Sequence, residues 1–132
     1  MKFLRIVTRV LAIIPIVTGV VTLFGLQDPI YGVVGLGHVT GPPVLDSNLR
    51  FFGGVWLALG VTMMWVAPDL DAHAPLFRFA WFAIFVGGIG RLISIAVVGL
   101  PPWPFVFLTV LEIVGAPLFL YWHSQVLRVE PR

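Results

Sequence analysis

The sequence predicts an all-α integral membrane protein with four transmembrane helices in an up-down-up-down bundle and both termini in the cytoplasm. Of its 132 residues, 59% are hydrophobic and only 11% are charged, whereas about a quarter of the residues in a soluble domain are charged. Four successive apolar runs of roughly 20 residues have the length that crosses a bilayer. The basic residues gather on one side of these runs, and this asymmetry sets the orientation.

The predicted transmembrane spans cover residues 6–26, 48–66, 76–100 and 104–123 of a single domain, residues 1–132. A basic start precedes the first span, as in a signal peptide, but no small-residue cleavage site follows, so we expect an uncleaved helix that is kinked at Pro15. Residues 27–47 are rich in glycine and proline and lack lysine and arginine. This composition predicts an irregular loop or a partly re-entrant segment. Asp46, Ser47 and Asn48 offer N-caps for the second span.

The remaining connections are short. Residues 67–75 form a polar turn before the third span, and residues 100–103 turn the chain into the fourth. On the second and third spans, pairs of small residues four apart let helices approach closely. We interpret these pairs as packing within the bundle, with a homodimer seam as the alternative. The pairs are Gly54 and Ala58, Ala83 and Gly87, and Gly90 and Ser94.

The orientation follows from the basic residues. Only Arg50 lies at the face away from the termini, so the positive-inside rule places both termini in the cytoplasm. The formal net charge of +2 gives no indication of a nucleic-acid partner. The absence of cysteine excludes disulfides and thiolate metal sites. The basic residues on the side of the termini are Lys2, Arg5, Arg9, Arg78, Arg128 and Arg132.

Two ionisable residues lie deep in the apolar runs, Arg91 in the third and Glu112 in the fourth. A charge at the centre of the hydrocarbon costs a few kcal/mol or more, so such residues usually pair with each other or line a polar cavity. At a rise of about 1.5 Å per residue, Arg91 lies ~13 Å and Glu112 ~12 Å from the turn that joins the two helices. Antiparallel neighbours would therefore hold the two side chains at the same depth.

Other polar side chains share the outer half of the bilayer with this pair when depth is counted in the same way. On the third and fourth spans the ionisable residue belongs to a stripe of small or polar residues, and we expect both stripes to face inward. The stripe of the third span is Gly87, Arg91, Ser94 and Val98, and that of the fourth is Thr109, Glu112, Ala116 and His123. The further polar residues at this depth are Arg50, Trp56, Thr18 and Thr22.

Three interpretations of the pair remain open. It is a structural ion pair that sets the register of the third helix against the fourth. Alternatively, with Arg50 nearby, the cluster carries net positive charge and suits an anionic head group or carboxylate, which arginine contacts through planar, bidentate hydrogen bonds. Proton coupling at Glu112 is the third interpretation, although a carboxylate locked to Arg91 is a poor proton carrier. Arg50 has its own alternative, in which it reaches to the outer head groups.

Cofactor and metal chemistry find little support. His38, His73 and His123 fall in different places, so no two of them face each other in the membrane to hold a haem. Asp69, Asp71 and His73 lack the ligand spacing of a known metal site and are interpreted as a solvated turn. No nucleophile elbow, P-loop or dinucleotide fingerprint is present, so no known catalytic motif supports an enzyme.

Three blocks of sequence resemble the signature stretches of an uncharacterised bacterial membrane family, domain of unknown function 4345. They are residues 46–54 with Asn48 and Arg50, residues 87–94 with Arg91 and Ser94 together with residues 99–101, and residues 111–117 with Glu112. The resemblance spans nearly the whole chain and implies a small four-helix protein of the bacterial inner membrane without an established activity. The chain is also distantly similar in architecture to the DoxX-like group, some of whose members accompany membrane redox enzymes; likeness of fold alone does not give function.

We therefore expect a non-enzymatic membrane protein, without cofactor or metal, that binds a lipid or amphipathic anion through a buried Arg/Glu polar cluster or acts as an accessory subunit. Its expected partners are membrane lipids, a membrane protein complex or further copies of itself. A small oligomeric carrier or channel for a hydrophobic or anionic solute is the alternative, and an enzyme acting on a lipid head group with Glu112 as acid or base is a third class. The predicted cluster comprises Arg91, Glu112, Arg50, Asn48, Ser94, Trp56 and Thr109.

Overall fold

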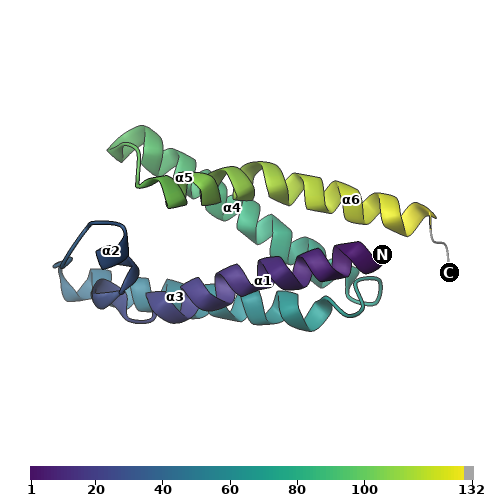
Figure 1. The fold of residues 1–132 in the computed structure, drawn as a ribbon, viewed down its shortest axis with the longest axis horizontal. Coiled ribbons are helices and arrows are strands. Elements are labelled where there is room, and N and C mark those ends of the chain that lie inside the picture. Colours follow the sequence, from purple (N-terminus) through teal and green to yellow (C-terminus); the bar gives the residue numbers. More distant parts are fainter. Residues whose placement is uncertain (130–132) are drawn as a thin grey trace. The chain divides into compact units, whose positions relative to one another are not determined.

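The computed structural model describes residues 1–129, and the chain divides into two compact units (Figure 1). One unit covers Lys2–Pro68, and the other contains Met1 and the chain from Asp69 onward. Within residues 1–129 every regular element is helical. Four helical stretches are long and apolar enough to cross a membrane: Lys2–Thr22, Pro43–Val66, Ala74–Val98 and Trp103–Arg128. Arg132, one of the basic residues used to predict the orientation, lies outside the described residues.

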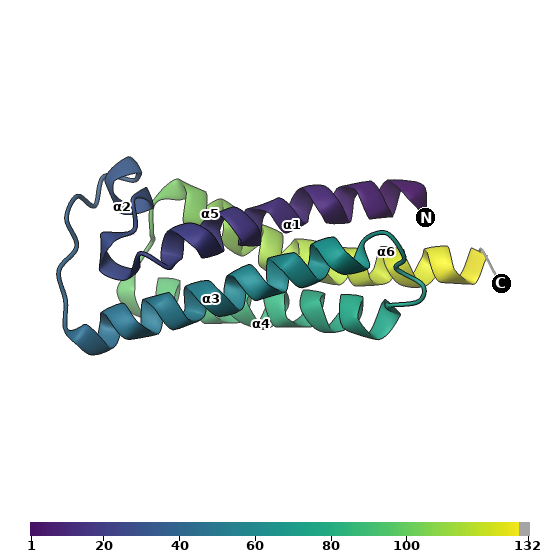
Figure 2. The ribbon, with the colours of Figure 1, turned by 90° about the horizontal axis from the view of Figure 1, so that it is seen from below.

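The N-terminal unit contains α1 (Lys2–Thr22), the short 3₁₀ helix η1 (Gly25–Gln27), α2 (Ile30–Val33) and α3 (Pro43–Val66). Helix α1 packs along α3 (Figures 1 and 2), and glycines bring the two backbones together. A Cβ added to Gly19 would lie 2.6 Å from the Leu57 backbone nitrogen, and one added to Gly60 would lie 2.8 Å from that of Ile16. Any larger side chain at these positions would separate the helices.

Helix α3 begins earlier than the sequence predicts. Pro42 is its N-cap and Pro43 occupies the first turn, a position where proline's fixed φ and missing N–H are compatible with a helix. The predicted N-cap role of Asp46, Ser47 and Asn48 is therefore wrong, because all three lie inside the helix. The preceding connection is irregular apart from η1 and α2, in agreement with its glycine and proline content.

The C-terminal unit contains α4 (Ala74–Val98), α5 (Trp103–Val110), the π-helical segment η2 (Leu111–Gly115) and α6 (Ala116–Val129). The last three elements follow one another without a break and form the fourth apolar stretch. Helix α4 packs against α5, η2 and α6. Gly99, with a φ of 113°, ends α4, because side chains other than glycine rarely adopt this conformation.

The buried face of the fourth apolar stretch is the one that the sequence predicts. Thr109, Glu112, Ala116 and His123 are all buried. Aromatic rings continue this core toward the end of α6, where the Phe119 ring stacks on that of Trp81 at a centroid distance of 4.5 Å. Offset and edge-on ring contacts of this kind add to the free energy gained from burial alone.

The predicted inward stripe of α4 is wrong by one residue. Gly87, Ser94 and Val98 are exposed, and a Cβ added to Gly87 would have no heavy atom within 4 Å. The large aromatic residues in the first turns of α4 determine which of its faces is buried, because packing a ring removes more apolar surface from water than packing a small residue does. The buried residues of α4 are Phe77, Ala80, Trp81, Ile84 and Gly88.

Candidate functional site

The candidate site is the ion pair between Arg91 on α4 and Glu112 on η2. The Arg91 Nε donates a hydrogen bond to Glu112 Oε1 at 3.2 Å and lies 2.9 Å from Oε2. The Glu112 side chain is only 6% exposed, whereas that of Arg91 is 37% exposed. The two charges thus have different surroundings: the carboxylate is enclosed by protein, and part of the guanidinium reaches the surface of the unit.

Two features of the backbone hold Glu112 in place. Residues Leu111–Gly115 form a π-helical segment, and such single turns inside α-helices are frequent at functional sites. Opposite this segment, Gly88 lets α4 approach closely, because an added Cβ would lie 2.8 Å from the Glu112 Cβ and 3.1 Å from Ile113 Cδ1. A glycine on one helix and a widened turn on the other therefore bring the carboxylate to Arg91.

The rest of the Arg91 guanidinium has no hydrogen-bond acceptor in the described chain. Its central carbon lies 5.9 Å from the centroid of the Phe105 ring, within the range of a cation–π contact. Among residues 1–129, only Glu112 accepts a hydrogen bond from Arg91, and it does so through Nε. The donors on Nη1 and Nη2 remain for a group outside the unit. The next two residues of α4, Leu92 and Ile93, are exposed apolar side chains.

Arg50, the second arginine of the predicted cluster, is engaged within the N-terminal unit. It donates to both carboxylate oxygens of Asp46 and to the backbone carbonyls of Leu23 and Phe24. Asp46 also accepts a hydrogen bond from the Leu26 N–H. We call Asp46 and Arg50 the α3 clasp. Arg50 gives the Leu23 carbonyl, just beyond the end of α1, a hydrogen-bond donor, and it adds a second donor to the Phe24 carbonyl, which also accepts the Gln27 N–H. That Arg50 forms one cluster with Arg91 and Glu112 stays a prediction.

The other predicted site residues also make their described contacts locally. The Trp56 indole nitrogen donates to the Thr18 hydroxyl at 2.8 Å, which joins α3 to α1. The Thr109 hydroxyl donates to the Phe105 carbonyl of its own helix. Asn48 and Ser94 are exposed on α3 and α4. Glu112 is thus the only member of the predicted cluster that the structure joins to Arg91.

Several contributors to these contacts were not predicted. Asp46 was interpreted as a cap, although its spacing of four residues from Arg50 is a helical ion-pair signal. The contact of Phe105 with Arg91 could not be predicted, because the sequence does not indicate which side chain of α5 faces the guanidinium. The π-helical segment likewise has no known signal in the sequence. Within residues 1–129 no three histidine or acidic side chains gather in a way that could hold a metal ion.

His123 lies apart from the ion pair. It is completely buried, its Nε2 lies 3.3 Å from the Leu70 carbonyl, and its ring centroid is 4.5 Å from that of Phe77. Because a carbonyl only accepts, Nε2 carries the proton in this contact. His123 therefore ties the turn before α4 to α6, which is a structural role.

The fold and the site together define a class: small, all-helical proteins with four apolar stretches of membrane-spanning length and, between the last two, an Arg–Glu pair whose carboxylate is buried. A model of the family described as "Domain of unknown function (DUF4345)" matches residues 3–123, and the chain belongs to this family. The match includes both residues of the ion pair. No curated protein and no solved structure matches the chain significantly.

Proposed function

We propose that this protein is a non-enzymatic integral membrane protein that binds the head group of a lipid, or another amphipathic anion, at Arg91. One observation carries the proposal: Glu112 uses only the Nε side of the guanidinium, and no residue among 1–129 accepts a hydrogen bond from Nη1 or Nη2. Polar donors in apolar surroundings cost free energy unless they find a partner. A phosphate or carboxylate is the partner that the geometry of arginine favours.

Glu112 acts in this proposal as a positioning residue. Because its carboxylate is enclosed and held by η2 and Gly88, it fixes the direction in which the guanidinium points. The pair is formally neutral, so the anion is held by charge-assisted hydrogen bonds to the two Nη groups rather than by a net positive field. The ion pair with Arg91 favours the ionised form of the carboxylate, and this supports a binding role rather than a catalytic one.

The test is native mass spectrometry of the protein in mild detergent, offered phosphatidylglycerol or oleate. Wild type should retain one of these anions, and Arg91→Lys should lose it, because lysine keeps a charge for Glu112 but lacks the fork of Nη donors. Arg78→Lys, an exposed arginine on the same helix, is the matched control and should bind like wild type. Retention by Arg91→Lys, or no retention by wild type, contradicts the proposal.

An accessory role in a membrane complex, or self-association, has separate support. Gly87 and Gly90 form an exposed small-residue stripe on α4, where an added Cβ would meet nothing within 4 Å. Small residues on an apolar helix surface let a second helix pack closely. Such a role agrees with the distant DoxX-like similarity, and a small carrier built from several copies would use the same stripe.

We also propose that both termini lie on the cytoplasmic side, in a bacterial inner membrane, because the basic residues gather at that side of the sequence. The chain contains no cysteine, so single cysteines give an unambiguous readout. A membrane-impermeant thiol reagent applied to whole cells should label Ser47→Cys, at an exposed position, and spare Ser124→Cys. The reverse pattern would invert the topology.

A further inference from the structure

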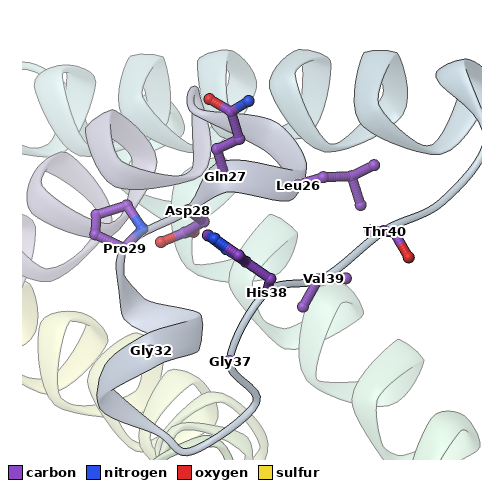
Figure 3. A pocket seen from close by; sticks show the side chains of 9 residues that line it. All are labelled: Leu26, Gln27, Asp28, Pro29, Gly32, Gly37, His38, Val39 and Thr40. Atoms are coloured by element: carbon purple, nitrogen blue, oxygen red, sulfur yellow. The ribbon is translucent and has the colours of Figure 1, made fainter.

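A cavity of about 790 Å³ lies beside the connection that leads from α1 to α3 (Figure 3). This volume is in the range of small-molecule sites. All the residues that line it belong to the N-terminal unit, and neither Arg91 nor Glu112 is among them. Its walls combine apolar side chains, namely Leu26, Pro29 and Val39, with the polar groups of Asp28 and His38.

Asp28 is the only charged group in the wall, and it is buried, with an exposed fraction of 5%. Its carboxylate accepts hydrogen bonds from the Thr22 hydroxyl at 3.3 Å and from the Ile30 N–H at 2.9 Å. Both donors are neutral. A carboxylate has about four acceptor positions, so the two hydrogen bonds leave acceptor capacity on a residue that lines the cavity.

No cation in the described chain neutralises this carboxylate. Residues 27–49 contain no lysine or arginine, and no ion pair to Asp28 is formed by any of residues 1–129. In Figure 3 the ring of His38, which also lines the cavity, points toward Asp28. Burial, together with the negative charge of Asp28, raises the pKa of the Tyr31 phenol. Buried charges in proteins are paired or coordinate a cation.

We propose that this cavity binds a small organic cation with an apolar body, whose charged nitrogen pairs with Asp28. The apolar walls favour the hydrocarbon part of such a ligand, and the unpaired carboxylate favours its charge. A metal ion is the less suitable occupant, because within residues 1–129 no three ligating side chains gather and the volume far exceeds that of an ion. The ligand is an amine or quaternary ammonium, either free or as the head group of a lipid.

Benzyltrimethylammonium is the probe, with benzyl alcohol as its uncharged counterpart, and binding is measured by calorimetry on full-length protein in phosphatidylglycerol nanodiscs. Wild type should bind the cation saturably and the alcohol at least tenfold more weakly. Asp28→Asn should weaken binding of the cation at least tenfold, while its amide oxygen still accepts the Ile30 hydrogen bond. Equal binding of cation and alcohol, or no binding by wild type, overturns the proposal.

A second pair of variants keeps the test independent of any effect on folding. His38→Lys places an ammonium in the cavity wall near Asp28, so it should weaken binding of the probe at least tenfold, whereas Val33→Lys, at an exposed position outside the cavity lining, should stay within threefold of wild type. Unchanged binding by His38→Lys counts against the proposal. Nanodiscs that also contain phosphatidylcholine distinguish the two sources of the ligand. If this lipid competes with the probe, a lipid head group is the occupant; if it does not compete, the occupant is a free cation.

Discussion

Truncating either side of the Arg91–Glu112 pair should have unequal effects on stability. Arg91→Ala leaves a carboxylate that is 6% exposed without its counter-ion, and breaking a buried pair in this way costs about 3–5 kcal/mol. Glu112→Gln keeps an amide oxygen for Arg91 Nε and leaves a guanidinium that is 37% exposed, so the loss should be about 1 kcal/mol. The double variant should be more stable than Arg91→Ala alone, because its amide is neutral.

The free energy of unfolding is measured by steric trapping in bicelles for wild type, both single variants and the double variant. The expected order of destabilisation is Arg91→Ala first, then the double variant, then Glu112→Gln. Equal losses from the two single variants would show that the carboxylate is not enclosed as described. A double variant no more stable than Arg91→Ala would show that removal of the arginine acts through packing and not through charge.

Three further predictions concern packing, hydrogen bonding and titration. Gly88→Ala should lower the free energy of unfolding by about 1–3 kcal/mol, because it overpacks the contact between the helices. The control Gly90→Ala, whose added Cβ meets nothing within 4 Å, should raise it by up to about 1 kcal/mol. Similar effects of the two variants would contradict the described packing at Gly88. Trp56→Phe removes the hydrogen bond to Thr18 on α1, so the free energy of unfolding should fall by about 0.6 kcal/mol. An unchanged value in steric trapping would show that this hydrogen bond does not stabilise the fold. Absorbance titration in a background without the other tyrosine should place the pKa of Tyr31 above the ordinary value of 10.0, and Asp28→Asn should lower it. Because the pKa of Tyr31 is raised in the folded protein, its protonated phenol contributes to the free energy of unfolding at a pH below the pKa of tyrosine in the unfolded chain. This contribution is lost as the pH rises through the pKa of Tyr31 in the folded protein.

The helical class and the pairing of Arg91 with Glu112 could be predicted from the sequence, because both follow from sums over consecutive residues: the hydropathy of a segment and the length of a helix. Hydropathy over a window predicts an apolar helix, and the rise per residue gives the depth of each polar group. The inner face of the fourth stretch was predicted correctly for the same reason. Its buried residues recur at helical spacing.

The face of α4 and the packing glycines could not be predicted in this way. Nearly every position of α4 is apolar or small, so no hydrophobic stripe separates an inner from an outer face. Gly53 and Gly54 are adjacent in the sequence, yet an added Cβ would lie 2.9 Å from the Leu23 backbone at the first and only reach ordinary contact, at 3.8 Å, at the second. The difference is a rotation of about 100° about the helix axis, which only the neighbouring helix determines.

The partner of Arg50 shows a further limit of prediction from sequence. A basic residue near a helix start has several low-energy solutions, including head groups, a distant acid and carbonyls of a preceding helix. The structure selects Asp46 and the end of α1. This choice depends on the path of the loop before α3, which glycines and prolines leave open.

The α3 clasp has a consequence for the way the chain is made. Backbone groups without a partner cost several kcal/mol each in a membrane, and just beyond the end of α1 the Leu23 and Phe24 carbonyls both accept hydrogen bonds from Arg50. By the time α3 has emerged from the ribosome, α1 has its partner, and the polar groups between them are bonded within Lys2–Pro68. The contacts that hold α1 to α3 therefore lie within the first half of the chain, so the residues that form this helical hairpin are all present before α4 is synthesised.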